Sequence, residues 1–313
     1  MKNGGLAAAL MLAACQGLAQ MPQDIAARLR EIGPVLNPQM IQDTFSLYVA
    51  KVPKAAAGVS SVEDLAYGPD ERHRLDVFAP AAAPGRAMPV VLFAPGGAYV
   101  GGAKNREGVP FYQNVGVFFA KNGVVGVTMN YRLAPRHTWP AGGEDVALAV
   151  RWLRGHIAEF GGDPQRIFLF GQSAGGTHVA HYVFDERLQP PGGADGVAGA
   201  ILQSAVLDPA GGPQGPNVEA YFGPRAGWAG RSLLTKLEGR KIPVFIVTAE
   251  LDPREFRDQA ALLAAGLEKR DGGARPPTLE LPGHNHISEI AHLGSADDTA
   301  FGEALLEFVR SRN

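Results

Sequence analysis

The chain has 313 residues, of which 46% are apolar and 19% charged, a balance typical of a globular protein and not of a disordered chain. Its formal net charge of −2 gives no electrostatic reason to expect a nucleic-acid partner. This length allows one large α/β domain or two small ones.

The first 19 residues are set apart by composition. Lys2 is followed by a short apolar run, GGLAAALMLAAC, which cannot span a bilayer but suits a secretory signal. Cleavage after Ala19 competes with cleavage before Cys15, where LAAC resembles a bacterial lipobox and would leave Cys15 lipidated. The alternative is an ordinary N-terminal helix. We expect an exported protein, periplasmic or secreted, with no transmembrane span in its mature form and with or without a lipid anchor.

Cys15 is the only cysteine of the chain. The mature body, residues 20–313, therefore has no internal disulfide and no thiol nucleophile.

Helices and apolar runs alternate along most of the chain. Two amphipathic helices are expected within 20–51, and a short antiparallel strand pair within 63–80. Apolar, strand-like runs then occupy 88–94, 123–130, 166–170, 198–208, 242–250 and 277–283. Helices are expected near 108–121, 143–160, 174–186, 254–270 and 298–311. Strands that are apolar throughout and separated by helices predict an α/β fold whose parallel sheet is buried on both faces.

The segment 209–241 interrupts this alternation. It is rich in glycine and proline, is longer than an ordinary connecting loop, and contains a predicted helix at 231–238. It follows one predicted strand and precedes the next, at the carboxyl edge where open α/β sheets bind ligands. We therefore expect 209–241, with the helices of 20–51, to form a small cap on a single domain, 20–313. The alternative is a plain surface loop.

Ser173 lies in the pentapeptide GQSAG, which matches the G-x-S-x-G nucleophile elbow. A serine held at a sharp strand-to-helix turn needs strained dihedral angles, and glycine two residues away on either side removes the clash. The helix that follows directs its free N–H groups toward the serine. The motif therefore predicts a nucleophile. The alternative is that the glycines only let a strand turn into a helix.

A serine nucleophile needs a base and an acid that orients it, and in this arrangement the chain order is Ser, Asp or Glu, His. Asp252 follows the apolar run 242–250 directly, and it is preferred to Glu250 and Asp208. Asp252 could also cap the helix that begins after Pro253. For the base, the stretch LPGHNHISE offers two candidates, His284 and His286.

An oxyanion hole is expected in FAPGGAYVGG, residues 93–102, which follows an early core strand. Gly96 and Gly97 would let the main chain approach a substrate without side chains in the way. We assign the donating N–H groups to Gly97, Ala98 and Ala174. The alternative is a glycine-rich turn with no role in binding.

Six segments between about 67 and 290 together resemble one known family. They read YGPDERHRLDVFAP, APGGAYVGG, NYRLAPRHTWPAGGEDVALAVRWL, GGDPQRIFLFGQSAGG, AELDP and GHNHIS. In this order they are similar to the hormone-sensitive-lipase and carboxylesterase branch of the α/β-hydrolase superfamily, which includes small bacterial esterases. The resemblance implies an α/β-hydrolase fold, with helices on both faces of a mostly parallel sheet and a small cap.

The same resemblance implies a serine carboxylesterase that cleaves short- to medium-chain carboxylic esters through an acyl-enzyme, with no metal or organic cofactor. It favours His286 over His284 as the base. It also makes Asp145, near the start of a predicted helix, a cap or ion-pair partner beside the oxyanion loop and not a catalytic acid. Two alternatives stay open: an amidase or arylformamidase with the same triad, and a non-catalytic ligand-binding protein on this fold.

One position departs from the family. Where the family usually has histidine before the oxyanion donors, this chain has Pro95, which has no N–H and a fixed φ. The donors are backbone groups of later residues, so we expect the hole to survive. Loop orientation and substrate range depend on what holds the loop instead. The natural substrate depends on how the cap segments fold, and Tyr99, Tyr221, Phe222 and Trp228 are candidates either for the pocket wall or for the core.

Overall fold

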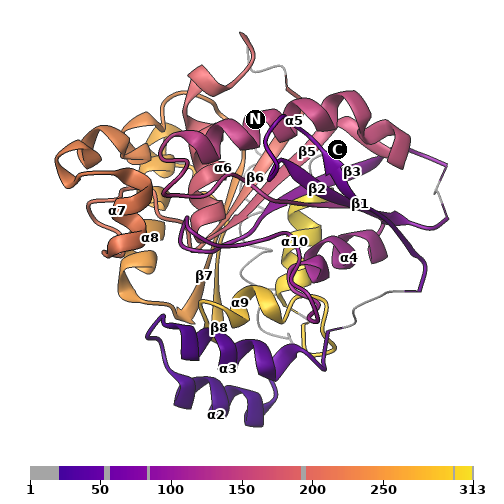
Figure 1. Cartoon of the computed structure of the whole chain (residues 1–313), viewed down its shortest axis with the longest axis horizontal. Coiled ribbons are helices and arrows are strands. Elements are labelled where there is room, and N and C mark those ends of the chain that lie inside the picture. The colour runs from indigo at the N-terminus through magenta and orange to yellow at the C-terminus, as the bar shows by residue number, and fades with distance from the viewer. Residues whose placement is uncertain (1–20, 53–56, 83–84, 192–194, 299, 312–313) are drawn as a thin grey trace.

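The computed structural model describes residues 21–52, 57–82, 85–191, 195–298 and 300–311, so the predicted signal at 1–19 and Cys15 lie outside the described residues. Within these ranges, eight strands form one sheet in the order β1-β2-β4-β3-β5-β6-β7-β8 (Figure 1). The strands are β1 Val59–Ala66, β2 Arg74–Pro80, β3 Met88–Ala94, β4 Val125–Met129, β5 Gly162–Gln172, β6 Val197–Gln203, β7 Val244–Leu251 and β8 Thr278–Asn285. β2 pairs antiparallel with β1 and β4, and all other neighbours pair parallel.

Helices cover both faces of this sheet (Figure 1). They are α2 Gln23–Ile32, α3 Pro38–Tyr48, α4 Gln113–Lys121, α5 Ala141–His156, α6 Ala174–Phe184, α7 Pro216–Phe222, α8 Arg254–Arg270, α9 Ser288–Ala291 and α10 Phe301–Arg310. Apolar side chains of α5, α6 and α8 join one buried cluster with the sheet, and those of α2, α3, α4 and α10 join another. None of the described helices combines the length and the apolar character needed to cross a bilayer.

Strand β3 explains why the predicted strands are apolar without alternation. Val90 and Leu92 pack into the first cluster, and Val91 and Phe93, which point to the other face, pack into the second. All four are fully buried. The predicted α/β fold, with a mostly parallel sheet buried on both faces, is therefore confirmed.

Several predicted elements differ from the observed ones. The strand expected at 198–208 ends at Gln203, because Ser204 adopts a left-handed φ of 46° that leaves the strand conformation. The helix expected from residue 108 begins only at Gln113, after Gly108 with a φ of 78°. The α-helix expected at 231–238 is wrong. That region holds 3-10 turns at Arg225–Arg231 and Leu233–Lys236, in a glycine-rich stretch that disfavours a longer helix.

The two predicted N-terminal helices are present as α2 and α3, which lie beside β8 and α9 (Figure 1). Asn37 caps α3 by accepting the amide of Met40 at 2.9 Å. At the far end of β8, the Asn285 amide group donates to the Thr44 hydroxyl at 3.0 Å. This contact ties α3 to the segment that carries His284 and His286.

Candidate active site

Ser173 stands between the end of β5 and the start of α6, with φ 54° and ψ −121°. A Cβ atom on Gly171 would overlap the carbonyl of Gly175, and one on Gly175 would overlap the carbonyl of Ala94. Both glycines of the pentapeptide are therefore required by close backbone packing. The strained serine that results is the feature expected of a nucleophile elbow.

Ser173, His286 and Asp252 form one hydrogen-bonded chain. The Ser173 Oγ lies 2.9 Å from the His286 Nε2, and the His286 Nδ1 lies 2.8 Å from the Asp252 Oδ1. Ionised Asp252 can only accept, so the Nδ1 carries a proton and the Nε2 is left to accept from the serine. Asp252 also accepts the Ala249 amide at 2.9 Å. His286 and Asp252 are each only 2% exposed. This arrangement can remove a proton from the serine.

His284, the other candidate base, has a different environment. Its Nδ1 lies 3.1 Å from the Ser288 hydroxyl, and its ring lies 4.0 Å from that of His292. Burial, and then the neighbouring His292, hold the pKa of His284 well below its usual value. The structure therefore brings His286, and not His284, to Ser173.

The rival acids also lie elsewhere. Glu250 is exposed and accepts the Gly283 amide at 2.6 Å, a contact between the end of β7 and β8. The amide of Asp208 donates to the Gln259 side chain at 2.8 Å, in the segment that leads into 209–241. Neither carboxylate contacts His286 in the structure's hydrogen bonds.

A second carboxyl group, Glu289, lies beside this chain and was not singled out from sequence. It is fully buried, and its Oε2 lies 2.8 Å from the Ser204 Oγ, which in turn lies 2.6 Å from the Asp252 Oδ2. Its Oε1 accepts from the Gln172 amide at 3.0 Å. Burial, and then the charge of Asp252, raise the pKa of Glu289 well above its usual value.

The sequence carried a faint signal for these neighbours. Gln172 precedes Ser173, and Glu289 follows His286 by three residues, so both are adjacent to predicted site residues. Ser204 carries no such signal in the sequence, because it reaches the site only through the position at which β6 ends.

Asp252, His286 and Glu289 are also the one group of three potential metal ligands in the described part of the chain, with donor atoms within 4.8 Å. These atoms are hydrogen-bonded within the site.

The loop after β3 carries the predicted oxyanion donors. Gly97, Ala98 and Tyr99 all have positive φ, at 148°, 50° and 68°. A side chain on Gly97 would overlap the backbone of Gly101, so the loop turns back on itself only with glycine there. Gly97 and Ala98 line the same cavity as Ser173, and Ala174 opens α6 directly after it. Two of the three predicted donors thus lie in the wall of the cavity that contains Ser173, and the third follows the serine directly in the chain.

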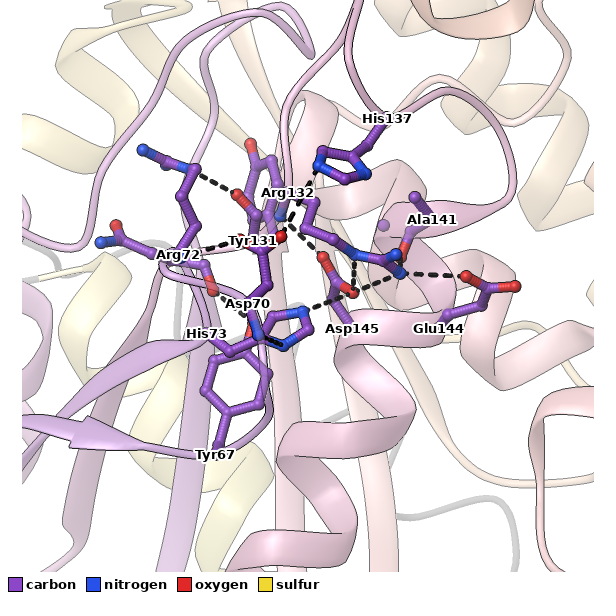
Figure 2. Close-up of polar contacts among 12 residues, drawn as sticks. Tyr67, Asp70, Arg72, His73, Tyr131, Arg132, His137, Ala141, Glu144 and Asp145 are labelled. Carbon is purple, nitrogen blue, oxygen red and sulfur yellow. Dashed lines mark hydrogen bonds and ion pairs between the residues drawn. The ribbon is translucent and has the colours of Figure 1, made fainter.

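Tyr131 holds this loop where Pro95 leaves it without a side-chain donor. The Tyr131 hydroxyl donates to the Pro95 carbonyl at 2.7 Å. Burial raises the pKa of Tyr131 above its usual value, so the phenol keeps its proton. Arg72 donates a 2.8 Å hydrogen bond to the Tyr131 carbonyl (Figure 2) and another of 2.8 Å to the Gly102 carbonyl. The Tyr131 hydroxyl therefore holds one end of the loop, at Pro95, and Arg72 holds the other end, at Gly102.

Asp145 anchors the segment that carries Tyr131. It is fully buried in α5 and accepts the Arg132 amide and the Arg132 Nε, each at 2.7 Å. The His73 Nε2 lies 3.0 Å from the same carboxylate (Figure 2). Of the two structural roles expected for Asp145, ion-pair partner and helix cap, the structure shows the ion pair.

The cavity above Ser173 and His286 has a volume of about 620 Å³. Both predicted cap segments contribute walls, through residues 36–38 and 41 and through residues 213–218. Its apolar lining includes Leu36, Ile41, Val218, Phe256 and Ile287, and its charged lining includes Arg106 and Glu255.

Four aromatic residues were candidates for the wall or the core. Tyr99, Tyr221, Phe222 and Trp228 form a buried cluster, in which the rings of Tyr99 and Tyr221 stack at 4.6 Å. The cluster packs the 209–241 segment onto the oxyanion loop. These aromatics therefore belong to the core.

Known proteins share this fold and sequence pattern. The family model described as "Carboxylesterase family" matches residues 73–215. Esterase LipQ of Mycobacterium tuberculosis is 31% identical over 74% of this chain and 58% of its own length. The probable isoprenylcysteine alpha-carbonyl methylesterase ICMEL1 of Oryza sativa is 28% identical over 76% of this chain and 51% of its own. The chain thus spans between about half and three fifths of these relatives.

Solved structures show the same fold along nearly the whole chain. The hyperthermophilic esterase of Pyrobaculum calidifontis has a TM-score of 0.67 at 22% identity, covering 99% of this chain and 98% of that one. Esterase B of Lactobacillus rhamnosis, inhibited by a tributyrin phosphonate, has a TM-score of 0.72 at 17% identity, covering 93% and 96%. With the strand order and the serine elbow already described, these similarities lead to one conclusion. The chain has the α/β-hydrolase fold, and its residues 73–215 match the carboxylesterase family.

Proposed function

We propose that the protein is a serine carboxylesterase that hydrolyses short- to medium-chain carboxylic esters. The observation that carries this proposal is the hydrogen-bonded chain from Ser173 through His286 to Asp252, at the floor of a cavity lined by the oxyanion loop. The name of LipQ as an esterase agrees with it. An enzyme of this kind needs no metal or organic cofactor, and its partner is a small ester.

In the first half-reaction, the Ser173 oxygen attacks the ester carbonyl while the His286 Nε2 takes the hydroxyl proton. The carbonyl oxygen becomes an oxyanion, which the N–H groups of Gly97, Ala98 and Ala174 stabilise. Asp252 stabilises the imidazolium that forms. When the tetrahedral intermediate collapses, the bond to the alcohol oxygen breaks and the imidazolium returns the proton to that oxygen. The alcohol leaves, and the acyl group remains on Ser173.

The second half-reaction repeats these steps with water as the nucleophile. His286 takes a proton from the water as its oxygen attacks the acyl-enzyme. The new oxyanion forms in the same hole. Collapse then breaks the bond to the Ser173 oxygen, which regains a proton from the imidazolium, and the carboxylic acid is released.

Cavity size and lining support the proposed chain length. A volume of about 620 Å³ is in the range of pockets that enclose small organic ligands. The apolar lining given above suits an alkyl chain, and Tyr99, Tyr221, Phe222 and Trp228 lie in the core and not in this lining.

An acyl-chain panel on the purified mature protein tests the proposal. We expect acetyl, butyryl and other short esters to be cleaved faster than long-chain esters and faster than an N-formyl arylamine. Ser173→Ala should lower turnover by about four to six orders of magnitude, and a fluorophosphonate probe should label the native protein but not this variant. Absence of ester cleavage and of labelling would refute the proposal, and faster cleavage of the N-formyl arylamine would favour the amidase.

We also propose that the protein is exported, on the basis of the charged and apolar composition of residues 1–19. N-terminal sequencing of the protein purified from its native host should begin after residue 19. If the protein is instead a lipoprotein, Cys15→Ser should release it from the membrane fraction. An intact N-terminus on cytoplasmic protein would contradict export.

A further inference from the structure

The Ser204 hydroxyl lies between two carboxyl groups but has only one proton to donate. Its Oγ is 2.6 Å from the Asp252 Oδ2 and 2.8 Å from the Glu289 Oε2. If both carboxyl groups were ionised, one of these short contacts would join two acceptors. Both contacts become hydrogen bonds only if one carboxyl group keeps its proton and donates it to Ser204.

The charges nearby favour a single ionised group. Among the described residues, the ion-pair partner of Glu289 is the same His286 that pairs with Asp252, at 3.8 Å and 2.8 Å. One imidazole carries at most one positive charge and cannot balance two buried carboxylates. The phenol of Tyr112, whose pKa burial raises to about 12, is near enough to feel the charge of Glu289 and stays neutral. One carboxyl group of the pair therefore holds a proton.

The hydrogen bonds decide which of the two carboxyl groups is ionised. Asp252 accepts from the His286 Nδ1 and the Ala249 amide, and these bonds favour its charged form. Glu289 has one such donor besides Ser204, the Gln172 amide at 3.0 Å. Its O–H can donate to Ser204, and the Ser204 O–H can then donate to Asp252. Every polar contact in the group is satisfied this way.

We propose that Glu289 is a positioning residue, a neutral carboxylic acid that acts through Ser204 to hold Asp252 ionised and facing His286. The strained Ser204, with its φ of 46°, supports this role, because a left-handed serine persists where its surroundings hold it. The Gln172 amide also donates to the His286 carbonyl at 2.9 Å, so it links Glu289 to the backbone of the base. The role rests on the proposed function.

Three variants test the proposal by kinetics. Glu289→Ala and Ser204→Ala each remove one hydrogen bond of the path from Glu289 through Ser204 to the Asp252 carboxylate. We expect kcat/KM to fall about ten- to a hundredfold with KM nearly unchanged. Glu289→Gln keeps a donor, its amide N–H, and should recover most of this loss. Glu250→Gln, an exposed and matched substitution outside the chain, should behave as the native enzyme. Equal losses in the Gln and Ala variants, or native activity in Glu289→Ala, would overturn the proposal.

The acid limb of the pH profile of kcat/KM, where activity falls as the pH drops, is a second test. A simple loss of packing would not change the pH at which this limb occurs. If Glu289 is neutral, Glu289→Gln removes no charge, and the limb stays where it is. If Glu289 is ionised, the substitution removes a negative charge 3.8 Å from the imidazole, and the limb moves to lower pH by about one unit or more. Such a displacement would overturn the proposal.

Infrared spectroscopy tests the protonation state without activity. At neutral pH we expect a carbonyl stretch of a protonated carboxyl group in the native protein, present in Asp252→Asn and absent in Glu289→Gln. A native spectrum without this band would overturn the proposal even if the alanine variants fail to fold. If the native protein cleaved no ester, the proposed function would fail, and this measurement would still decide the state of Glu289.

Discussion

Asp145 and Glu289 are both fully buried carboxyl groups, but the charges around them differ. Asp145 accepts from the Arg132 guanidinium at 2.7 Å and from the His73 imidazole at 3.0 Å. Glu289 has no comparable cation among the described residues, and Asp252 lies one hydroxyl away. A buried carboxylate with a cation holds two segments together. A buried carboxyl group beside another acid must keep a proton, and that arrangement is found next to the nucleophile.

This comparison predicts opposite outcomes for the two histidines after β8. His286→Ala should lower kcat by about four orders of magnitude or more, because Ser173 loses its base. His284→Ala should lower kcat less than tenfold, because His284 pairs with Ser288 and not with the serine. Ester turnover of both variants, with circular dichroism to show that they fold, checks this. An inactive His284→Ala beside an active His286→Ala would reverse the assignment.

Asp145 should affect stability before chemistry. Asp145→Ala leaves the buried ends of Arg132 and His73 without their acceptor, and we expect the free energy of unfolding to fall by about 3–5 kcal/mol. Glu144→Gln is the matched control, since Glu144 meets the same guanidinium at 3.0 Å on the exposed side, and should cost about 1 kcal/mol or less. Urea unfolding measures both. A stable Asp145→Ala with greatly reduced turnover would give Asp145 a role in the reaction.

His178 should make stability depend on pH separately from activity. Burial lowers its pKa to about 3, whereas in the unfolded chain a histidine titrates near its ordinary value of about 6.5. The unfolded state therefore binds more protons between these values, and stability falls as the pH drops from about 6.5 toward 3. His178 contributes up to about 1.4 kcal/mol per pH unit to this slope.

Denaturant unfolding at several pH values checks this contribution. His178→Asn should show a shallower loss of stability on acidification than the native protein, even if it is less stable at pH 7. Its acid limb of activity should be unchanged, because the base is His286. An identical slope in both proteins would contradict a buried neutral His178.

The sequence was sufficient for the sheet and for the order of the site segments. Runs such as that of β3 are apolar on both faces, and this property is readable from composition. The positions of Ser173 and Asp252 follow from local motifs at strand ends. The choice of His286 over His284 depended on family resemblance, because two histidines in one short loop carry the same local signal. Only the side-chain directions in the structure separate them.

Long-range contacts account for what the sequence could not supply. The glycine-rich 225–236 turns are held by packing of Tyr221, Phe222 and Trp228 on Tyr99, which no local pattern encodes. Ser204 meets Glu289 across 85 residues. The support for Pro95 comes from Tyr131, 36 residues later. Each is a pairing between segments whose meeting depends on the whole fold.

Removing the Tyr131 hydroxyl should give the smallest of these effects. Tyr131→Phe leaves the buried ring in place but takes the donor from the Pro95 carbonyl, and we expect a loss of about 1 kcal/mol in stability. A loop that shifts on release should misplace the Gly97 and Ala98 amides, so kcat should fall severalfold while KM changes less. Tyr67→Phe, which removes a donor to the Asn130 carbonyl, is a control for a lost buried hydroxyl outside the loop. Equal kcat in Tyr131→Phe and the native enzyme would mean that the glycine packing alone holds the oxyanion loop. Pro95 would then need no hydrogen bond from Tyr131 in place of the histidine that the family usually has at this position.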